Sequence, residues 1–280
     1  TGLTKRDLVD WYLHAAPRML PHLEGRPVAL VRAPSGIAGP HFFQKHAGTL
    51  RIEELKELPA RLDAPHPPLV EIDTFTALVS AAQMNVVEFH TWNAHSARIE
   101  KPDRMTFDLD PGEGIAWRAM QEAALRVRDL LASIGLAAFV KTSGGKGLHV
   151  VVPLEPKDGW DAVRDFSREV VEALARAAPD RFVAKSGAKN RIGRIFVDYL
   201  RNGRGATTAA AWSARARPGL GVSVPCAWEE LPDLRSGDHW TIRDAHERLE
   251  SADPWSGYPA AARTLGAARR ALESAWKQPA

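Results

Sequence analysis

Residues 107–114 read FDLDPGEG, so Asp108 and Asp110 stand at alternate positions of an apolar run. Residues two apart in a β-strand point to the same face, and we therefore expect the two carboxylates to lie side by side. Neighbouring carboxylates repel each other unless a hard cation lies between them. The segment thus indicates a divalent-metal site of the kind used in phosphoryl transfer. The alternative is a solvated turn in which both aspartates accept hydrogen bonds from nearby backbone amides.

Composition limits the classes of protein that the chain can belong to. Its 280 residues, 45% of them hydrophobic, can bury a sizeable core in one large domain or two modest ones. Because there is no apolar run of about 18 residues and no amino-terminal signal pattern, we expect a cytoplasmic protein that does not enter a membrane. The single cysteine, Cys226, cannot form an internal disulfide or a thiolate metal site, and we expect it to be an inert core residue.

The net charge of +3 is unevenly distributed. Residues 185–217 contain eight basic residues and a single acid, Asp198. A basic stretch around one carboxylate suits a polyanion laid across a metal site. The alternative is a solvated charged face, although such faces usually mix both signs.

Periodicity predicts a mixed α+β chain with central β-sheets flanked by helices. The expected helices cover residues 4–20, 75–83, 115–134, 160–174 and 260–276. The expected strands cover residues 27–31, 69–72, 86–89, 105–109, 139–141, 149–152 and 195–200. Since no segment has the composition of a linker, we expect one domain over residues 1–280.

A glycine-rich turn, residues 142–149 (TSGGKGLH), joins two of these strands. Its glycines leave backbone amides unobstructed beside a hydroxyl, an ammonium and an imidazole, which makes the turn a candidate triphosphate cradle. It is not a Walker A loop, because the spacing differs and a strand follows it. An ordinary hairpin turn is the alternative.

Asp198 lies in the apolar stretch 195–200, where an unpartnered buried carboxylate is costly. It therefore needs a cation, either a metal ion or a structural salt bridge to a neighbouring arginine. Arg201 would point to the opposite side of an ideal strand, whereas a bend at residues 202–203 would bring it toward the same cleft.

Two further segments contain aromatic or basic residues suited to nucleic acid. Residues 42–46 (FFQKH) place two aromatics beside basic residues, and such rings can stack on bases while the cations meet phosphates. In the alternative, one ring lies in the core and the other is partly exposed. His90, at the end of an apolar strand, could contact a nucleotide or hydrogen-bond in the interior.

These segments, in this order, closely resemble the polymerase domain of bacterial ATP-dependent DNA ligase D, in the archaeo-eukaryotic primase superfamily. The resemblance rests on residues 107–114, 141–149 and 195–198, with further matches at 25–27, 42–46 and 215–219. It implies an archaeo-eukaryotic primase-type fold with an RRM-like catalytic core. It also implies that residues 1–280 are a single primase-polymerase domain excised from a larger multifunctional ligase.

The resemblance implies an enzyme that adds ribonucleotides or deoxyribonucleotides to a primer 3'-hydroxyl at gaps and double-strand-break ends in bacterial non-homologous end joining. Addition is template-directed, with some untemplated addition, and uses two Mn²⁺ ions or Mg²⁺. The implied partners are gapped duplex with a 5'-phosphate, NTP or dNTP, the ligase and nuclease modules of the parent protein, and Ku. The implied location is the cytoplasm, with association with the nucleoid during repair. A two-metal nuclease and a non-catalytic DNA-end binding module are the alternatives.

Site residues are likewise implied by matching positions. The catalytic, metal-binding carboxylates are Asp108, Asp110 and Asp198. The nucleotide-binding residues are Ser143, Gly144, Lys146, His149, Arg201 and His90. The DNA-binding residues are Phe42, Phe43, Lys45, Arg215, Arg217 and, for the 5'-phosphate of a downstream strand, Lys5.

Overall fold

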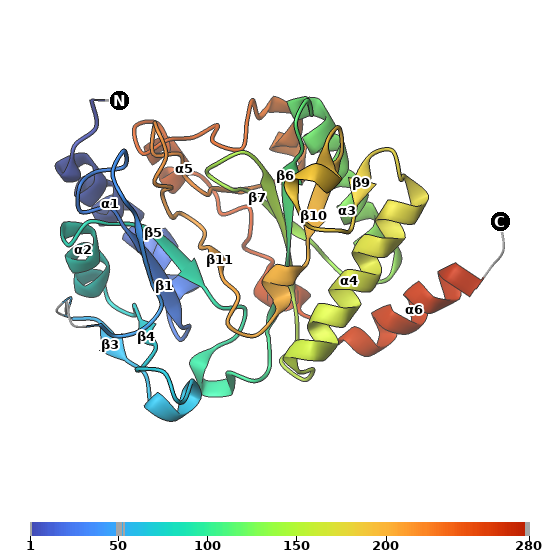
Figure 1. Ribbon diagram of the computed structural model, residues 1–280, viewed down its shortest axis with the longest axis horizontal. Coiled ribbons are helices and arrows are strands. Elements are labelled where there is room, and N and C mark those ends of the chain that lie inside the picture. Colours follow the sequence, from blue (N-terminus) through green and yellow to red (C-terminus); the bar gives the residue numbers. More distant parts are fainter. Residues whose placement is uncertain (1, 49–51, 53, 278–280) are drawn as a thin grey trace.

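The computed structural model describes residues 2–48, 52 and 54–277 (Figure 1). Within them, a four-stranded sheet and a six-stranded sheet form two halves of the molecule, and a two-stranded sheet lies beside the first half. Helices pack on both main sheets, so the expected mixed α and β fold is confirmed.

The first main sheet has the strand order β11-β5-β1-β2. Its strands are β1 (Val28–Arg32), β2 (Phe42–Gln44), β5 (Val86–Thr91) and β11 (Thr208–Ala209), and its helices are α1 (Lys5–Leu23), α2 (Phe75–Gln83) and α5 (His246–Glu250). Thr4 caps the amino terminus of helix α1, and its hydroxyl accepts a hydrogen bond from the Asp7 amide in a capping box. Trp11 and Tyr12 of α1 are fully buried in the core under this sheet.

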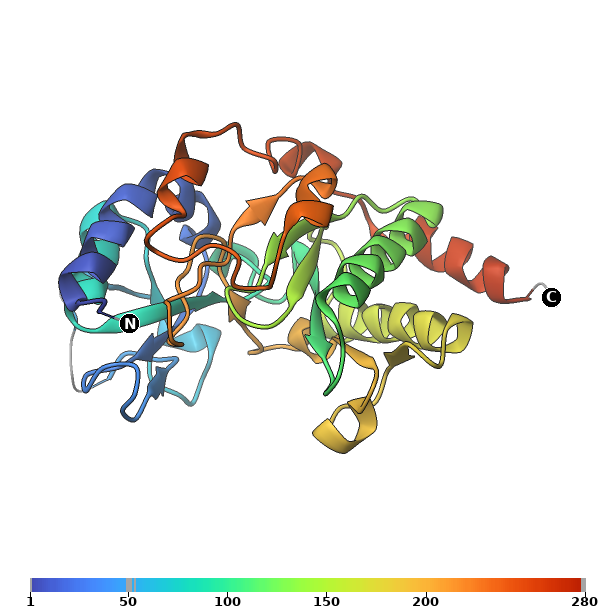
Figure 2. The same cartoon turned by 90° about the horizontal axis from the view of Figure 1, so that it is seen from above.

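The second main sheet has the strand order β12-β7-β8-β6-β10-β9. Its strands are β6 (Arg104–Pro111), β7 (Phe139–Thr142), β8 (Leu148–Pro153), β9 (Phe182–Val183), β10 (Ile195–Asp198) and β12 (Pro225–Cys226). Helices α3 (Trp117–Ser133) and α4 (Trp160–Ala177) lie side by side on one face of this sheet (Figure 1 and Figure 2). They bury Val127 and Phe166 in the core between the helices and the sheet. The other face of β6 is therefore free to present polar residues.

Residues beyond Trp228 contribute to the second core. Leu231 and Leu234 are buried there, and the Trp255 indole donates a hydrogen bond to the Val140 carbonyl at 3.0 Å. The last helix, α6 (Leu265–Lys277), adds buried Leu272. This part of the chain, whose periodicity is irregular before the final helix, thus has a structural role.

The small sheet pairs β3 (Lys56–Glu57) with β4 (Val70–Glu71). Cys226 is buried, as expected, and burial raises the pKa of its thiol to about 12. No helix among the described residues is both long enough and apolar enough to cross a membrane.

Every predicted helix and strand is present, but several boundaries were wrong. The last helix begins at Leu265 and not at residue 260, because Pro259–Ala261 form a separate 3-10 turn. The strand predicted over residues 195–200 ends at Asp198, since the chain turns into a 3-10 helix at Leu200–Asn202. Five short strands, β2, β3, β9, β11 and β12, were missed because two or three residues are too few to show a period.

Candidate active site

One polar row crosses four neighbouring strands of the second sheet. Lys141 on β7 lies opposite His149 on β8, His149 lies opposite Asp108 on β6, and Asp108 lies opposite Asp198 on β10. Directly opposed residues share a face of the sheet, and Asp110 shares it too because it lies two residues after Asp108. The structure thus brings the three predicted carboxylates together.

Arg201 joins these carboxylates because the strand ends early. The 3-10 turn after Asp198 directs the Arg201 side chain back toward the carboxylates. Arg201 Nε lies 3.1 Å from Asp198 Oδ2 and 3.6 Å from Asp108 Oδ2. Asp198 Oδ1 also accepts a hydrogen bond from the Leu200 amide at 2.9 Å. The bend that the sequence left open is therefore present, and it begins at Leu200, two residues before the expected position at 202–203.

The carboxylates differ in their affinity for protons. Burial raises the pKa of Asp110 to about 6, and the negative charges of Asp108 and Asp198 add to the rise. Arg191, whose Nη1 lies 3.3 Å from Asp110 Oδ2, lowers this pKa but does not cancel the rise. Burial likewise raises the pKa of Asp198. Burial also opposes ionisation of Asp108, but His149 and Arg201 outweigh it and lower its pKa. A divalent cation would relieve this repulsion, so the residues present fit a metal ion.

The glycine-rich turn packs directly against the aspartate strand. Ser143 Oγ accepts hydrogen bonds at 3.1 Å from the amides of both Gly145 and Gly147. A Cβ on Gly147 would lie 2.0 Å from the Leu109 carbonyl oxygen, so only glycine permits this approach. The turn is therefore held rigidly beside the carboxylates, and Lys146 at its tip is exposed.

A cleft of about 850 Å³ opens beside the turn and the end of β6. Four basic residues line it, Lys146, Arg191, Arg217 and Arg235, and two acids, Glu113 and Asp238. This balance of charge suits a phosphorylated ligand. Arg191, which contacts Asp110, connects the cleft to the carboxylates.

Lys141 is a site residue that the sequence did not reveal. Its ammonium lies 2.8 Å from His149 Nδ1 and donates hydrogen bonds to the Ala209 carbonyl and the Ser223 hydroxyl. Burial lowers the pKa of Lys141 well below its usual value. The contact directs the opposite ring nitrogen of His149, Nε2, toward Asp108 Oδ1 at 3.3 Å. No role could be assigned to Lys141 from the sequence, although it opens the segment 141–149, because its contacts with His149, Ala209 and Ser223 depend on the tertiary structure.

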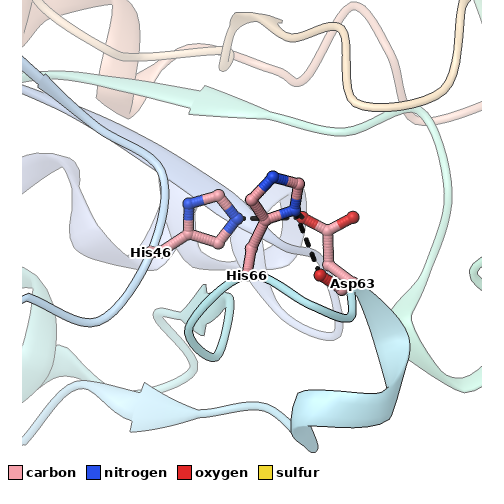
Figure 3. Close-up of side chains that lie close together, drawn as sticks. All are labelled: His46, Asp63 and His66. Atoms are coloured by element: carbon pink, nitrogen blue, oxygen red, sulfur yellow. Dashed lines mark hydrogen bonds and ion pairs between the residues drawn. The ribbon is translucent and has the colours of Figure 1, made fainter.

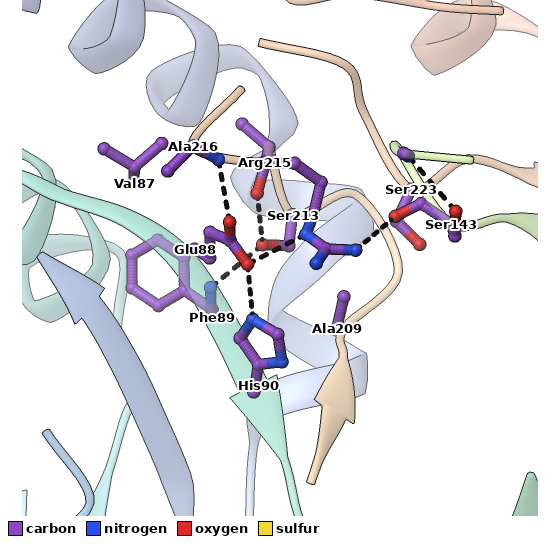
Figure 4. Close-up of polar contacts among 12 residues, drawn as sticks. Val87, Glu88, Phe89, His90, Ser143, Ala209, Ser213, Arg215, Ala216 and Ser223 are labelled. Atoms are coloured by element: carbon purple, nitrogen blue, oxygen red, sulfur yellow. Dashed lines mark hydrogen bonds and ion pairs between the residues drawn. The ribbon is translucent and has the colours of Figure 1, made fainter. Parts of the chain in front are cut away.

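A second buried cluster joins the two sheets (Figure 4). Glu88 Oε2 on β5 lies 2.6 Å from His90 Nε2 and 2.8 Å from Arg215 Nε, and Arg215 Nη1 donates to the Ser143 carbonyl at 2.9 Å. His90 and Arg215 lower the pKa of Glu88 to about 2, although burial alone would raise it. Burial lowers the pKa of His90. Glu88 was missed, yet a carboxylate inside an apolar strand was the signal that identified Asp198.

The predicted DNA-binding residues do not form one surface: Arg217 lines the cleft and Arg215 pairs with Glu88, whereas the others lie in two further places. Phe42 and Phe43 are 57% and 51% exposed, so the alternative that placed one of these rings in the core is wrong. The Phe43 ring meets the His90 ring edge-on, with their centroids 5.8 Å apart. The Lys45 ammonium lies 5.7 Å from the centroid of the Phe43 ring. Lys5 is exposed at the first residue of α1 and lines a separate cleft of about 270 Å³.

Comparison with known proteins identifies relatives of this chain. A LigD protein of Pseudomonas aeruginosa, described as a multifunctional non-homologous end joining protein, is 49% identical over 95% of this chain and 32% of its own length. The LigD of Mycobacterium tuberculosis is 34% identical over 83% of this chain and 32% of its own length. The chain thus spans about a third of the length of these relatives.

A solved structure has the same fold. It is described as the polymerase domain from Mycobacterium tuberculosis ligase D in complex with DNA, and it is 31% identical to this chain. The match covers 92% of this chain and 93% of that one, with a TM-score of 0.83. Residues 4–255 match the family described as LigD, primase-polymerase domain. The chain belongs to this family of nucleotidyltransferases, the polymerase domains of the end-joining protein LigD.

Proposed function

We propose that this chain adds ribonucleotides or deoxyribonucleotides to a primer 3'-hydroxyl at DNA gaps and broken ends, mostly under the direction of a template. The observation that carries the proposal is the row of Asp108, Asp110 and Asp198 between a rigid glycine-rich turn and a basic cleft. A two-metal nuclease would use the same carboxylates but would not need a turn that cradles a triphosphate.

Asp108, Asp110 and Asp198 would hold two divalent ions, with Mn²⁺ preferred and Mg²⁺ as an alternative. Carboxylate oxygens with an imidazole nearby suit an ion of intermediate softness. When bound, such ions lower the pKa of the attacking 3'-hydroxyl and neutralise the triphosphate and the leaving pyrophosphate.

The chain's own residues would position the nucleotide. Arg201 Nε faces Asp198 Oδ2 at 3.1 Å, but the side chain is 43% exposed, so its terminal guanidinium nitrogens would be available to a phosphate oxygen. Lys146 would bind the triphosphate from the tip of the turn, together with Ser143, Gly144 and His149. Lys141 would hold the His149 ring in place, and His90 would lie close to the nucleotide.

DNA would lie across the first half of the molecule, with Phe42 and Phe43 stacking near the template end and Lys45 near the backbone. It would reach the basic cleft, where Arg217 and the neighbouring Arg215 would meet the backbone. Residues 1–280 would act as one unit in the cytoplasm, associated with the nucleoid during repair. Strand sealing, end trimming and recruitment by Ku would belong to ligase and nuclease modules and to other proteins.

Primer extension tests the proposal directly. The substrate is a labelled primer in a gapped duplex with a 5'-phosphate, incubated with Mn²⁺ and either ribonucleotides or deoxyribonucleotides. We expect metal-dependent lengthening directed by the template base, with ribonucleotides preferred. A shortened primer would indicate a nuclease, and an unchanged primer despite DNA binding would indicate an end-binding module.

Replacing Lys5 should weaken recognition of the downstream 5'-phosphate. The side chain is exposed at the amino terminus of a 19-residue helix, where the macrodipole favours anions. Loss of one charge-assisted contact corresponds to about tenfold weaker binding. We expect Lys5→Ala to bind a gap with a 5'-phosphate about tenfold less tightly, and an unphosphorylated gap as before. Arg6→Ala, 90% exposed in the same helical turn, is the control. Equal losses on both gaps would exclude the assignment.

Replacing the exposed aromatics should weaken binding of single-stranded template. Stacking on one aromatic ring contributes about 1–3 kcal/mol per base. We expect Phe42→Ala and Phe43→Ala each to weaken binding to a 3'-overhang roughly tenfold or more in a fluorescence anisotropy titration. Phe75→Ala removes a ring that is 48% exposed at the start of α2 and should leave this affinity unchanged. Equal affinities for all three variants would argue against stacking by residues 42 and 43.

A further inference from the structure

Two histidines and an aspartate converge outside the carboxylate site (Figure 3). His46 follows β2, Asp63 follows the 3-10 turn Ala60–Leu62, and His66 lies three residues later. Asp63 Oδ2 lies 2.9 Å from His46 Nε2 and 3.3 Å from His66 Nδ1. The one oxygen and two nitrogens lie within 4.8 Å of one another, and the two imidazole rings are stacked with their centroids 5.2 Å apart.

We propose that His46, Asp63 and His66 form an additional metal site, which takes Zn²⁺ or a similar transition-metal ion. Zn–N bonds of about 2.0–2.1 Å in a tetrahedral site place ligand atoms about 3.3 Å apart, which the separation of His66 Nδ1 from Asp63 Oδ2 matches, whereas His46 Nε2 would move slightly away from Asp63 Oδ2. Two imidazoles and one carboxylate suit zinc, whereas Mg²⁺ and Ca²⁺ prefer oxygen ligands. Three protein ligands leave a fourth position for water or another donor.

The surroundings orient the carboxylate for this role. Arg204 Nη1 lies 3.0 Å from the other oxygen of Asp63, Oδ1, and the Arg204 guanidinium also pairs with Glu100 at 3.0 Å. Oδ2 is therefore left to face the two rings, as outer-shell partners commonly arrange for a ligating carboxylate. With two carboxylates and one guanidinium, the immediate environment has a net charge of −1, which favours a cation.

Burial and proton placement also fit a bound ion. The side chains of His46 and Asp63 are only 23% and 14% exposed, whereas that of His66 is 61% exposed and offers a path from solvent. When an ion binds, the proton on each coordinating nitrogen moves to the other ring nitrogen, His46 Nδ1 and His66 Nε2. Coordination would therefore replace the hydrogen bond between His46 Nε2 and Asp63 Oδ2 and the one between His66 Nδ1 and the Asp63 backbone carbonyl oxygen.

The site would join segments that are otherwise connected weakly. His46 lies two residues beyond β2, the strand that carries Phe42 and Phe43, and it is linked to residue 69 by a single isolated bridge. A metal ion would fasten β2 to the loop containing Asp63 and His66. It would therefore limit the movement of the exposed aromatics without taking part in chemistry at the carboxylates.

Metal binding to the whole chain, without nucleotide or DNA, tests the proposal independently of any polymerase activity. The Asp110→Asn background weakens the carboxylate site, and Co²⁺ replaces Zn²⁺ as a spectroscopic probe. We expect one ion bound per chain with the visible absorption of tetrahedral Co²⁺, and displacement of that signal by Zn²⁺. Adding His66→Gln should weaken Zn²⁺ binding at least about tenfold, since even loss of an outer partner costs about 10- to 100-fold.

The control is His14→Gln, which removes an exposed histidine of α1 that bonds to the Asp10 carbonyl. His46→Gln should reproduce the loss seen with His66→Gln, and circular dichroism will show whether each variant is folded. The proposal is overturned if Co²⁺ gives no tetrahedral spectrum, or if folded His46→Gln and His66→Gln bind Zn²⁺ as tightly as the control.

Discussion

Asp110→Asn should lower nucleotide addition by more than about a hundredfold, because loss of even an outer partner of a metal ligand costs about 10- to 100-fold. The same change should make the metal-free protein more stable. A pKa raised from 3.8 to about 6 means that ionised Asp110 opposes folding. The shift corresponds to about 3 kcal/mol, which the 38% exposure of the side chain reduces to about 1 kcal/mol.

The gain in stability should depend on pH with a defined sign. Below about pH 4, Asp110 is protonated in the folded and unfolded states, so aspartate and asparagine should give similar free energies of unfolding. As the pH rises from about 4 to about 6, the unfolded carboxyl ionises first and the wild type becomes relatively less stable. Above pH 6 the difference should be constant.

Urea unfolding at pH 4 and pH 7.5, with and without Mn²⁺, measures these effects. Mn²⁺ should stabilise the wild type and leave Asp110→Asn almost unchanged, which reverses their order of stability. Asp129→Asn, on the exposed side of α3, is the control and should change neither activity nor stability appreciably. Equal stabilisation of both proteins by Mn²⁺, or normal extension by Asp110→Asn, would contradict metal binding at this carboxylate.

The sequence predicted the parts of this site that lie within single segments. Residues 107–114 showed the paired aspartates, and the apolar neighbours of Asp198 showed that it needs a cation. Both inferences use only the alternation of a strand and the cost of a buried charge. The helices were recognised for the same reason, since 17 or 18 residues repeat an apolar stripe several times.

The remaining features depend on contacts between distant segments. The alignment of Lys141, His149, Asp108 and Asp198 requires the strand order and register, which no local pattern contains. Arg201 reaches the site because the strand ends at Asp198, and element ends are the least certain part of a sequence interpretation. The cluster of His46, Asp63 and His66 was missed because the loop that contains the last two is irregular.

Arg215→Gln should lower the free energy of unfolding by about 3 kcal/mol, because it leaves the carboxylate of Glu88 buried without its strongest charge partner. The Glu88 side chain is only 9% exposed, and that of Arg215 is 18% exposed. Arg217→Gln is the matched control, since Arg217 lies two residues away in an exposed position and should cost less than about 0.5 kcal/mol. Urea unfolding at pH 7.5 would compare the two variants. Similar stability for both would show that Arg215 contributes no more than a surface cation.

The double variant Glu88→Gln/Arg215→Gln distinguishes two causes of destabilisation: the loss of the ion pair itself and the burial of an unpaired Glu88 carboxylate. If the loss in Arg215→Gln comes from the unpaired carboxylate, removing that carboxylate as well should restore a large part of the stability. The double variant would still lack the hydrogen bond from Arg215 to the Ser143 carbonyl. It would also lack the close packing of Arg215 on Gly144, where an added Cβ would lie 2.7 Å from Arg215 Cγ. The double variant should therefore be stable but bind nucleotide with a raised KM, because the glycine-rich turn has lost its support from the first sheet. Full recovery of both stability and KM would mean that Arg215 only neutralises Glu88 and does not position the turn.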